Sequence, residues 1–407
     1  MKKCGLLGEK LGHSYSPAIH SMLADYEYRL YERAPEDLED FLKNGDWYGL
    51  NVTIPYKKSV VPFCTELSET ARAIGSVNTL VRLPDGGIFG DNTDAYGFEL
   101  MLHRSGLEPQ GKKCVVLGSG GASVMACAVL KAMGADTVVV ISRKGENHYG
   151  NLEKHADAAL LINTTPVGMY PRNGEAPVDL RTFPNLEGVA DVVYNPARTA
   201  LLLQAEMLGI PHTGGLTMLV AQAKRSAERF CGHSIDDSEI SRITGVLTRQ
   251  MQNIVLIGMP GCGKTKIAQA LSQRLGRPVY EADDILAEKA GLSIPEIFAR
   301  EGEAGFRARE TEVLRELGKL SGAVISTGGG CITREENYDL LHQNGIIIWR
   351  KRDISLLAKK GRPISMSRDL NELYGERKPL YERFADIVIE STDTIESAVE
   401  AILEALK

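Results

Sequence analysis

The segment Val255–Leu271, VLIGMPGCGKTKIAQAL, constrains the fold more than any other part of this 407-residue chain. An apolar strand sequence leads into Gly258–Thr265, which matches G-x-x-x-x-G-K-[ST], and an amphipathic helix sequence follows. The glycines allow successive backbone N–H groups to converge on phosphate oxygens, and the positive end of the next helix faces the same anion. The segment therefore predicts a phosphate-binding loop (P-loop) on a parallel α/β sheet.

Within this loop, Lys264 is expected to reach the β and γ phosphates, and Thr265 to ligate Mg²⁺. ATP and Mg²⁺ are therefore the expected cofactors of this half of the chain. The expected ATP-binding residues of the loop are Gly258, Met259, Pro260, Gly261, Cys262, Gly263, Lys264 and Thr265.

The composition of the chain argues against two classes of binding partner, nucleic acids and membranes. The formal net charge of −6 gives no basic footprint for nucleic acid, and no apolar run approaches the ~18 residues of a membrane helix. The seven cysteines contain no CxxC pair, so neither a disulfide framework nor a zinc site is indicated. We expect a cytoplasmic protein with small-molecule substrates and no nucleic-acid or membrane partner; the oligomeric state stays open.

The chain is organised as two α/β regions. Short β-rich runs such as KCVVLGSG, TVVVISRK and AVISTGGG alternate with helical stretches, which predicts strands layered with helices. A terminal helix sequence, DDSEISRITGVLTRQM, is followed directly by the strand NIVLIG. We therefore place one region at residues 1–249 and a P-loop region at residues 252–407.

A second glycine-rich turn, GSGGAS at Gly118–Ser123, follows the strand KCVVL and opens a helix. This is typical of a dinucleotide-binding turn, although its spacing only approximates G-x-G-x-x-G. The next strand ends at a cationic pair where an NAD site usually carries an acid, so NADP(H) is favoured over NAD. The residues expected to bind NADP are Gly118, Ser119, Gly120, Gly121, Ala122, Ser142, Arg143 and Lys144.

Motifs after the P-loop resemble shikimate kinase along about residues 252–407: YEADDILAEKAGLSIPEIFAREGEAGFRARE, STGGG, GRPIS and ERKPLYERFAD. The resemblance implies Asp283 as substrate ligand and base, and Glu281 as magnesium support where the family normally has aspartate. It also implies a lid arginine, Arg362, that meets the phosphates of ATP. The remaining residues implied to bind shikimate are Arg307, Gly328, Gly329, Gly330 and Arg377.

Motifs of the first half resemble shikimate dehydrogenase across about residues 3–247: GHSYSP, NVTIPYK, GSVNTL, GDNTDAYGF, INTTPVGMYP, DVVYNP and GGLTMLVAQA. The resemblance implies a two-lobed fold, with an α/β substrate lobe at about residues 1–96 plus 220–249. A Rossmann-like NADP lobe would occupy about residues 97–219. Only nineteen residues separate Arg143 from Asn163, fewer than the family commonly has, which predicts a trimmed nucleotide lobe.

The resemblance also implies site residues in this half. Lys57 and Asp94 would form the catalytic pair, in which the protonated lysine donates to the ketone oxygen as hydride arrives. Met169 and Gly215 would lie beside the nicotinamide. The residues implied to bind shikimate are Ser14, Ser16, Asn51, Thr53, Lys57, Asn78, Asp94, Tyr194 and Gln222.

Together the halves predict consecutive reactions: NADPH-dependent reduction of 3-dehydroshikimate to shikimate, then ATP-dependent phosphorylation of shikimate to shikimate 3-phosphate. Three alternatives stay open. The first half could be a quinate/shikimate dehydrogenase of broader range that uses NAD. One half could bind shikimate without catalysis, or the P-loop half could phosphorylate another polyol.

Overall fold

The computed structural model describes residues 1–12, 14–357, 369–390 and 394–407. The chain forms two compact units. The first comprises Met1–Met169, Glu175–Tyr194 and Leu201–Leu247, and the second Tyr170–Gly174, Asn195–Ala200 and Thr248–Lys407. Among the described residues, no helix combines the length and the apolar character that a membrane span requires.

The first unit begins with a six-stranded mixed sheet in the order β2-β1-β3-β5-β6-β4. One face is covered by α2 and the other by α1 and α7, whose Phe230 packs so closely that a Cβ at Gly49 would lie 2.4 Å from its ring. The elements are β1 (Lys3–Gly8), α1 (Ser16–Leu23), β2 (Glu27–Glu32), α2 (Leu38–Asn44), β3 (Gly49–Val52), β4 (Glu66–Leu67), α3 (Glu69–Ile74), β5 (Thr79–Arg82) and β6 (Ile88–Asp91).

The second lobe of this unit is a five-stranded sheet in the order β11-β10-β9-β7-β8, with every pair parallel. Its three central strands, β7, β9 and β10, are almost entirely buried because helices cover both faces, α4 and α5 on one and α6 on the other. The elements are β7 (Lys113–Leu117), α5 (Gly121–Ala132), β8 (Thr137–Ile141), β9 (Leu160–Asn163), β10 (Gly188–Asp191), α6 (Ala200–Met207) and β11 (His212–Thr213).

The stretch between β8 and β9 is short. Residues 142–159 are all described, and their only regular element is a 3₁₀ turn at Leu152–His155. If β7 is counted as strand 1 of this lobe, the described sheet has the order 2-1-3-4-5, because no further strand lies beyond β8 at that edge.

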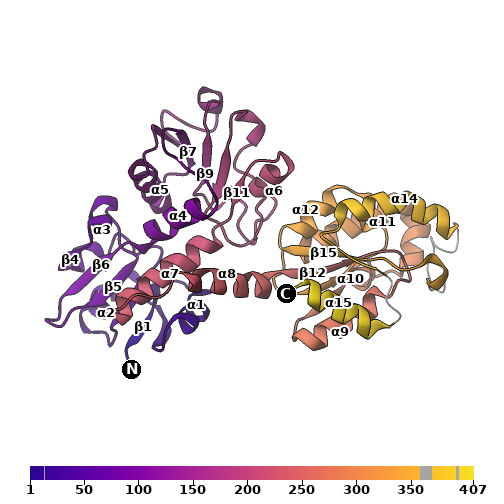
Figure 1. Ribbon diagram of the computed structural model, residues 1–407, viewed down its shortest axis with the longest axis horizontal. Helices are drawn as coiled ribbons and strands as arrows, with labels where there is room; N and C mark the ends of the chain where they lie inside the picture. The colour runs from indigo at the N-terminus through magenta and orange to yellow at the C-terminus, as the bar shows by residue number, and fades with distance from the viewer. Residues whose placement is uncertain (13, 358–368, 391–393) are drawn as a thin grey trace. The chain divides into compact units, whose positions relative to one another are not determined.

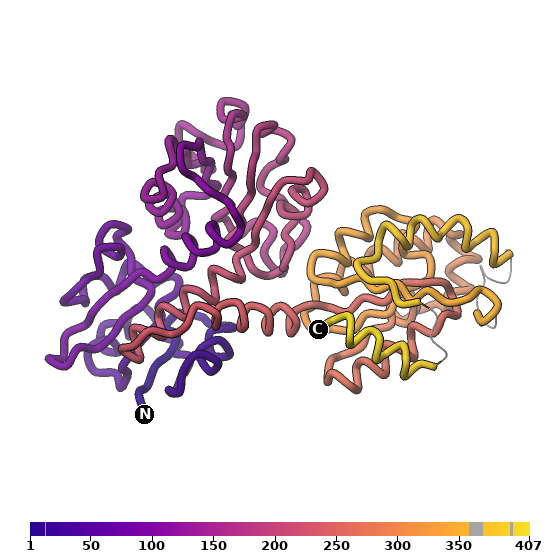
Figure 2. Tube along the Cα trace, in the orientation of Figure 1, coloured from indigo at the N-terminus to yellow at the C-terminus, as the bar shows by residue number. Residues whose placement is uncertain are grey.

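Two helices join the lobes of the first unit, α4 (Thr93–Arg104) and α7 (Leu216–Cys231). They lie against each other where the two sheets meet (Figures 1 and 2). The approach is close because α4 carries Gly97 at the crossing: a Cβ there would lie 2.6 Å from the carbonyl oxygen of Met218. Helix α8 (Ser238–Met251) follows α7 and leads into the second unit.

The second unit is a parallel sheet in the order β13-β14-β12-β15-β16. As Figure 1 shows, α9 and α15 cover one face and α10, α11, α12 and α14 the other, with a separate apolar core on each side. The elements are β12 (Asn253–Ile257), α9 (Lys264–Leu275), β13 (Val279–Glu281), α10 (Ala282–Ala290), α11 (Ile294–Leu317), β14 (Val324–Ser326), α12 (Glu336–His342), β15 (Gly345–Arg350), α14 (Leu370–Phe384), β16 (Ile387–Ile389) and α15 (Ile395–Ala405). The α/β fold class expected from the sequence is confirmed in both units.

Substituting Gly97→Ala should destabilise the first unit, because the added methyl group meets backbone of α7 that cannot move aside. We expect a loss of about 1–3 kcal/mol in the free energy of unfolding, measured by denaturant titration of the first unit's transition. Gly375→Ala is the matched control: Gly375 lies in α14, and no neighbouring atom lies within 4 Å of the place its Cβ would take, so alanine there should be neutral or slightly stabilising. Equal effects of the two substitutions would contradict the packing argument.

Candidate active sites of the two units

The catalytic pair expected in the first unit is assembled. The ammonium of Lys57, after β3, donates a hydrogen bond of 2.6 Å to the carboxylate of Asp94 in the first turn of α4. The two side chains are 32% and 17% exposed, so the pair is shielded yet reachable by a ligand. The pair can therefore hold a proton donor in a fixed position.

Three amide side chains expected to bind shikimate are brought together from distant segments. Asn51 at the end of β3 and Asn78 before β5 are almost completely buried, and Gln222 lies on α7. Asn78 Nδ2 lies 3.5 Å from Gln222 Oε1, and Asn51 Nδ2 donates to the hydroxyl of Ser226 at 2.8 Å. The structure therefore connects these amides through α7.

The remaining residues of the expected substrate set lie in loops and at a helix start. Ser16 begins α1, and its backbone N–H donates to the hydroxyl of Ser14 at 3.2 Å. Tyr194 meets Tyr15 edge to face, with ring centroids 6.1 Å apart. Thr53 follows β3, where its backbone N–H donates to the carbonyl of Leu7. The role of each in substrate binding stays a prediction.

The expected NADP turn has the backbone that a dinucleotide requires. Gly118, directly after β7, has φ 106°, and a Cβ there would lie 2.9 Å from the hydroxyl of Thr164. Gly120 and Gly121 open helix α5, and a Cβ on either would meet nothing within 4 Å. Open backbone at a helix N-terminus fits a pyrophosphate. Ser119 and Ala122 belong to the same turn.

The cationic residues expected to select NADP lie on the surface after β8. Arg143 and Lys144 are exposed, and the hydroxyl of Ser142 donates to the carbonyl of Lys144, which turns the chain. Exposed cations at this edge suit a 2′-phosphate. Of the residues expected beside the nicotinamide, Met169 is 44% exposed. Gly215 packs so tightly that a Cβ would lie 2.1 Å from the carbonyl oxygen of Val192.

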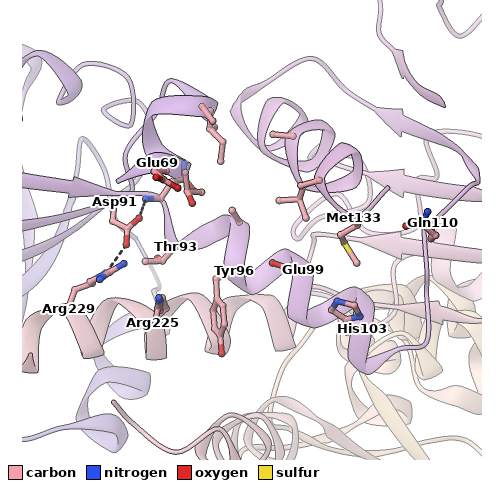
Figure 3. Close-up of a pocket in the computed structure, with 18 of the residues that line it drawn as sticks. Glu69, Asp91, Thr93, Tyr96, Glu99, His103, Gln110, Met133, Arg225 and Arg229 are labelled. Carbon is pink, nitrogen blue, oxygen red and sulfur yellow. Dashed lines mark hydrogen bonds and ion pairs between the residues drawn. The ribbon is translucent and has the colours of Figure 1, made fainter. Parts of the chain in front are cut away.

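A cavity of about 730 Å³ also lies at the junction of the lobes (Figure 3), but it is not the site expected from the sequence. The α4 residues that line it include Tyr96, Glu99 and His103, which lie on the helix face opposite Asp94 at 100° per residue. Among the lining residues, Arg229 and Asp91 form an ion pair of 2.8 Å. Neither Lys57 nor Asp94 lines this cavity.

In the P-loop of the second unit, the side chain of Lys264 is hydrogen-bonded to the backbone of the loop itself. Lys264, almost completely buried, donates to the carbonyl oxygens of Gly258 at 2.8 Å and Met259 at 3.3 Å. Gly258 has φ 144° and Gly263 has φ 99°, conformations that glycine adopts readily. The ammonium therefore lies in the loop cradle with α9 beginning beside it, an arrangement that fits a polyphosphate.

The expected magnesium residues form an oxygen pair. The hydroxyl of Thr265 donates to Glu281 Oε2 at 3.1 Å, and Glu281 Oε1 is buried without a hydrogen-bond partner among the described residues. Burial raises the pKa of Glu281, partly offset by the hydroxyls of Ser326 and Thr265. Such hard oxygen donors fit Mg²⁺, whose charge would favour the ionised carboxylate. Glu281 therefore lies within hydrogen-bond distance of Thr265, and its role as magnesium support stays a prediction.

The three glycines of the STGGG motif form the centre of the second site. A Cβ at Gly330 would lie 2.0 Å from Arg307 Nη2, and one at Gly329 would lie 2.5 Å from Pro260 of the P-loop. At Gly328 it would lie 2.4 Å from Glu310 Oε1 and 2.8 Å from Asp283 Oδ1. The P-loop, the expected base and the expected substrate arginine therefore meet at one glycine turn because that turn has no side chains.

Glu310 is a site residue that sequence reasoning missed. Its carboxylate is 1% exposed and accepts a 2.7 Å hydrogen bond from Arg307 Nη1, three residues earlier on α11. Burial raises the pKa of Glu310, and the Arg307 guanidinium opposes this shift. The i, i+3 spacing in FRARE could have indicated the pair. Glu310 fixes the orientation of Arg307.

Arg377 and Tyr381, on consecutive turns of α14, both donate to the carbonyl oxygen of Gly329, Arg377 at 3.1 Å. This places a second buried guanidinium at the glycine turn, and the role of Arg377 in binding shikimate stays a prediction. Tyr381 was not predicted. Arg362, the expected lid arginine, lies outside the described residues.

The fold and these sites define a two-unit α/β enzyme, with a dinucleotide lobe in the first unit and a phosphotransferase P-loop in the second. Residues 6–80 match the family model for the shikimate dehydrogenase substrate binding domain, and residues 260–407 match that for shikimate kinase. The shikimate dehydrogenase (NADP(+)) of Clostridium perfringens strain SM101 is 38% identical over 260 residues, 58% of this chain and 95% of that protein.

Solved structures agree with this. A chorismate mutase/shikimate 5-dehydrogenase fusion protein from Clostridium acetobutylicum is 39% identical, with a TM-score of 0.58, over 60% of this chain and 97% of that one. Shikimate 5-dehydrogenase from Thermus thermophilus, in complex with NADP(H) and shikimate, is 30% identical, with a TM-score of 0.55, over 60% and 98% of the two chains.

The chain belongs to the shikimate dehydrogenase family, and its second unit carries a shikimate kinase domain. The fused arrangement expected from the motifs is confirmed. The cofactors of the two families are NADP for the dehydrogenase part and ATP with Mg²⁺ for the kinase part, as expected.

Substituting Gly330→Ala should abolish most kinase activity, because the methyl group would displace the Arg307 guanidinium. We expect the shikimate KM of the kinase to rise at least about tenfold while the dehydrogenase rate stays unchanged, measured by ADP release and NADPH oxidation on one preparation. Gly375→Ala adds the same methyl group within the same unit at a place where it meets no neighbouring atom, so it should leave the KM unchanged. An unchanged KM in Gly330→Ala would show that Arg307 does not bind the substrate.

Proposed function

We propose that the protein catalyses two consecutive reactions: reduction of 3-dehydroshikimate to shikimate with NADPH, and phosphorylation of shikimate to shikimate 3-phosphate with Mg-ATP. The observation that carries the proposal is the presence in one chain of two assembled sites. One is the 2.6 Å pair of Lys57 and Asp94, and the other is the glycine turn where Pro260, Asp283 and Arg307 meet. The product of the first reaction is the substrate of the second.

In the first reaction, NADPH supplies the hydride when it is bound at the Gly118–Gly121 turn. Reduction places negative charge on the ketone oxygen, so a proton donor is required beside it. Lys57 is held by Asp94 in the position to donate that proton, and the serine and amide side chains of the pocket would orient the substrate's carboxylate and hydroxyls. Asn51 and Asn78 are buried, which shields these two amides from bulk water.

In the second reaction, Mg-ATP supplies the phosphoryl group, and the protein contributes position and charge. Lys264 would leave the carbonyls of Gly258 and Met259 to contact the phosphates, so the lysine charge is already inside the cradle. Asp283 would orient the attacking hydroxyl and accept its proton. Arg307, held by Glu310, would bind the substrate carboxylate together with Arg377.

We further propose that residues 1–249 and 252–407 are the two catalytic domains and that the protein acts in the cytoplasm. All seven cysteines are free thiols in the described structure, which is consistent with a reducing compartment.

A single-vessel assay with 3-dehydroshikimate, NADPH, Mg²⁺ and ATP tests the two-step proposal. The wild type should oxidise NADPH and release ADP, Lys57→Ala should lose both signals, and Lys264→Ala should lose only ADP, each by at least about 100-fold. Supplied shikimate should restore ADP release to Lys57→Ala. The exposed neighbours give matched controls, Lys58→Ala and Lys266→Ala, which should retain both activities.

Failure of the wild type to release ADP from supplied shikimate would leave the second unit as a binding module or a kinase for another polyol. Oxidation of NADH but not NADPH, with quinate as the better substrate in the reverse direction, would favour the broader quinate/shikimate dehydrogenase.

Arg143→Ala should weaken the binding of NADPH more than that of NADH, because the guanidinium is the expected partner of the 2′-phosphate. We expect the ratio of kcat/KM for NADPH to that for NADH to fall about 10- to 100-fold, the cost of a lost charge-assisted hydrogen bond. Lys131→Ala, an exposed cation on α5 in the same lobe, should leave the ratio unchanged. Equal losses with both nucleotides would assign Arg143 to the shared pyrophosphate instead.

A further inference from the structure

A buried hydrogen-bond network connects α7 to the amides of the proposed shikimate site. Its centre is the hydroxyl of Ser226, a residue that none of the sequence motifs indicated and that is completely buried. Around it lie Asn51 Nδ2 at 2.8 Å, Thr79 Oγ1 at 2.8 Å and Thr93 Oγ1 at 2.9 Å. These three residues lie in β3, β5 and α4. The hydroxyl of Ser226 on α7 therefore contacts three other elements of the first unit.

The direction of the hydrogen bonds at Ser226 follows from counting protons. Its hydroxyl lies 3.0 Å from the backbone carbonyl of Gln222, one turn earlier on α7, and a carbonyl can only accept. With that proton donated to the carbonyl, the two lone pairs of Ser226 Oγ accept from Asn51 Nδ2 and from one of the two threonine hydroxyls. The Asn51 atom that faces it must then be the NH₂ group, which fixes an amide orientation that is otherwise ambiguous.

The opposite end of the Asn51 amide is fixed by Tyr28. The phenol donates to Asn51 Oδ1 at 2.8 Å, and burial raises the pKa of Tyr28 well above its usual range, so the phenol keeps its proton. Its ring stacks on His20 with centroids 4.1 Å apart, and burial lowers the pKa of His20 to about 3, so this neighbour is uncharged. The acceptor Oδ1 therefore lies at the Tyr28 end of the amide, opposite Ser226.

Asn78 and Gln222 are fixed independently, by backbone groups. The N–H of Thr93 donates to Asn78 Oδ1 at 2.7 Å, so the NH₂ group of Asn78 lies at the other end of the amide. Gln222 Nε2 donates to the carbonyl of Leu219 at 2.9 Å, which leaves Gln222 Oε1 as an acceptor. Each of the three amides thus has a defined polarity.

We propose that Ser226 is a positioning residue that sets the orientation of the Asn51 amide in the shikimate site, with its NH₂ group toward α7 and its Oδ1 toward Tyr28. This inference rests on the proposed dehydrogenase function and goes beyond it, because it assigns an orientation to the Asn51 amide and a role to a residue that does not touch the substrate. Rejection of substrates that lack one hydroxyl then depends on Ser226, since a misaligned amide leaves a buried polar group unpaired.

The test compares Ser226→Ala, Asn51→Ala and the double variant in steady-state assays of the dehydrogenase. Ser226→Ala should raise the KM for shikimate about tenfold, with kcat changed less than about threefold and the KM for NADP unchanged. In the Asn51→Ala background, Ser226→Ala should add less than about twofold, because both substitutions act through the same amide. Ser226→Thr, which keeps the hydroxyl, should restore part of the affinity.

Ser105→Ala is the matched control. The hydroxyl of Ser105 makes the same kind of bond to the carbonyl of the preceding turn, at 2.8 Å to Met101 on α4, and this bond is remote from the amide network. The substitution should leave the KM unchanged. Kinase activity of the same polypeptide and the thermal midpoint report the integrity of each preparation.

An unchanged KM in Ser226→Ala, or fully additive effects with Asn51→Ala, would overturn the inference. If Ser226→Ala does not yield folded protein, Tyr28→Phe removes the other fixed end of the Asn51 amide and carries the same test, with the same KM increase expected and the same failure if the KM is unchanged. Absence of dehydrogenase activity in the wild type would instead refute the proposed function.

Discussion

The contact between α4 and α7 holds the first unit together. It is possible because Gly97 presents no side chain to the backbone of α7, with a Cβ there only 2.6 Å from Met218 O. The two helices join the lobes, and they also carry functional groups: Asp94 on α4, and Gln222 and Ser226 on α7. The packing that joins the lobes therefore also sets the positions of the proposed catalytic carboxylate and of the amide network.

The second unit depends on a similar absence of side chains. Arg307, Pro260, Asp283 and Glu310 approach the glycines of the STGGG turn at distances that a Cβ would prohibit. The buried ion pair of Arg307 with Glu310 is then useful for position rather than for stability, because burying both charges costs much of what their attraction gains. In both units, glycines let neighbouring segments pack closely, and this packing fixes the positions of charged side chains that would be mobile on an exposed surface.

Sequence reasoning was most successful where function depends on a contiguous segment. The P-loop, the GSGGAS turn and the family motifs could be interpreted from order and spacing alone, and the α/β class followed from alternating strands and helices. The nineteen residues between Arg143 and Asn163 could be counted from the sequence, and the only regular element there is a 3₁₀ turn; trimming relative to the family stays a prediction. The residues that were missed, Glu310, Tyr381, Tyr28 and Ser226, act through contacts rather than through motifs.

The order of residues along the chain was enough to establish the two families, their cofactors and the kinds of residue that can carry the chemistry, because phosphate cradles and dinucleotide turns are local backbone structures. Folding then decided which of those residues meet. Lys57 and Asp94 are separated by 37 positions, and Asn51 and Ser226 by 175, so only the folded chain brings each pair within hydrogen-bond distance. The orientation of the Asn51 amide is likewise a tertiary property, because it depends on the hydroxyl of Ser226, which donates its hydrogen bond to the Gln222 carbonyl and accepts one from Asn51.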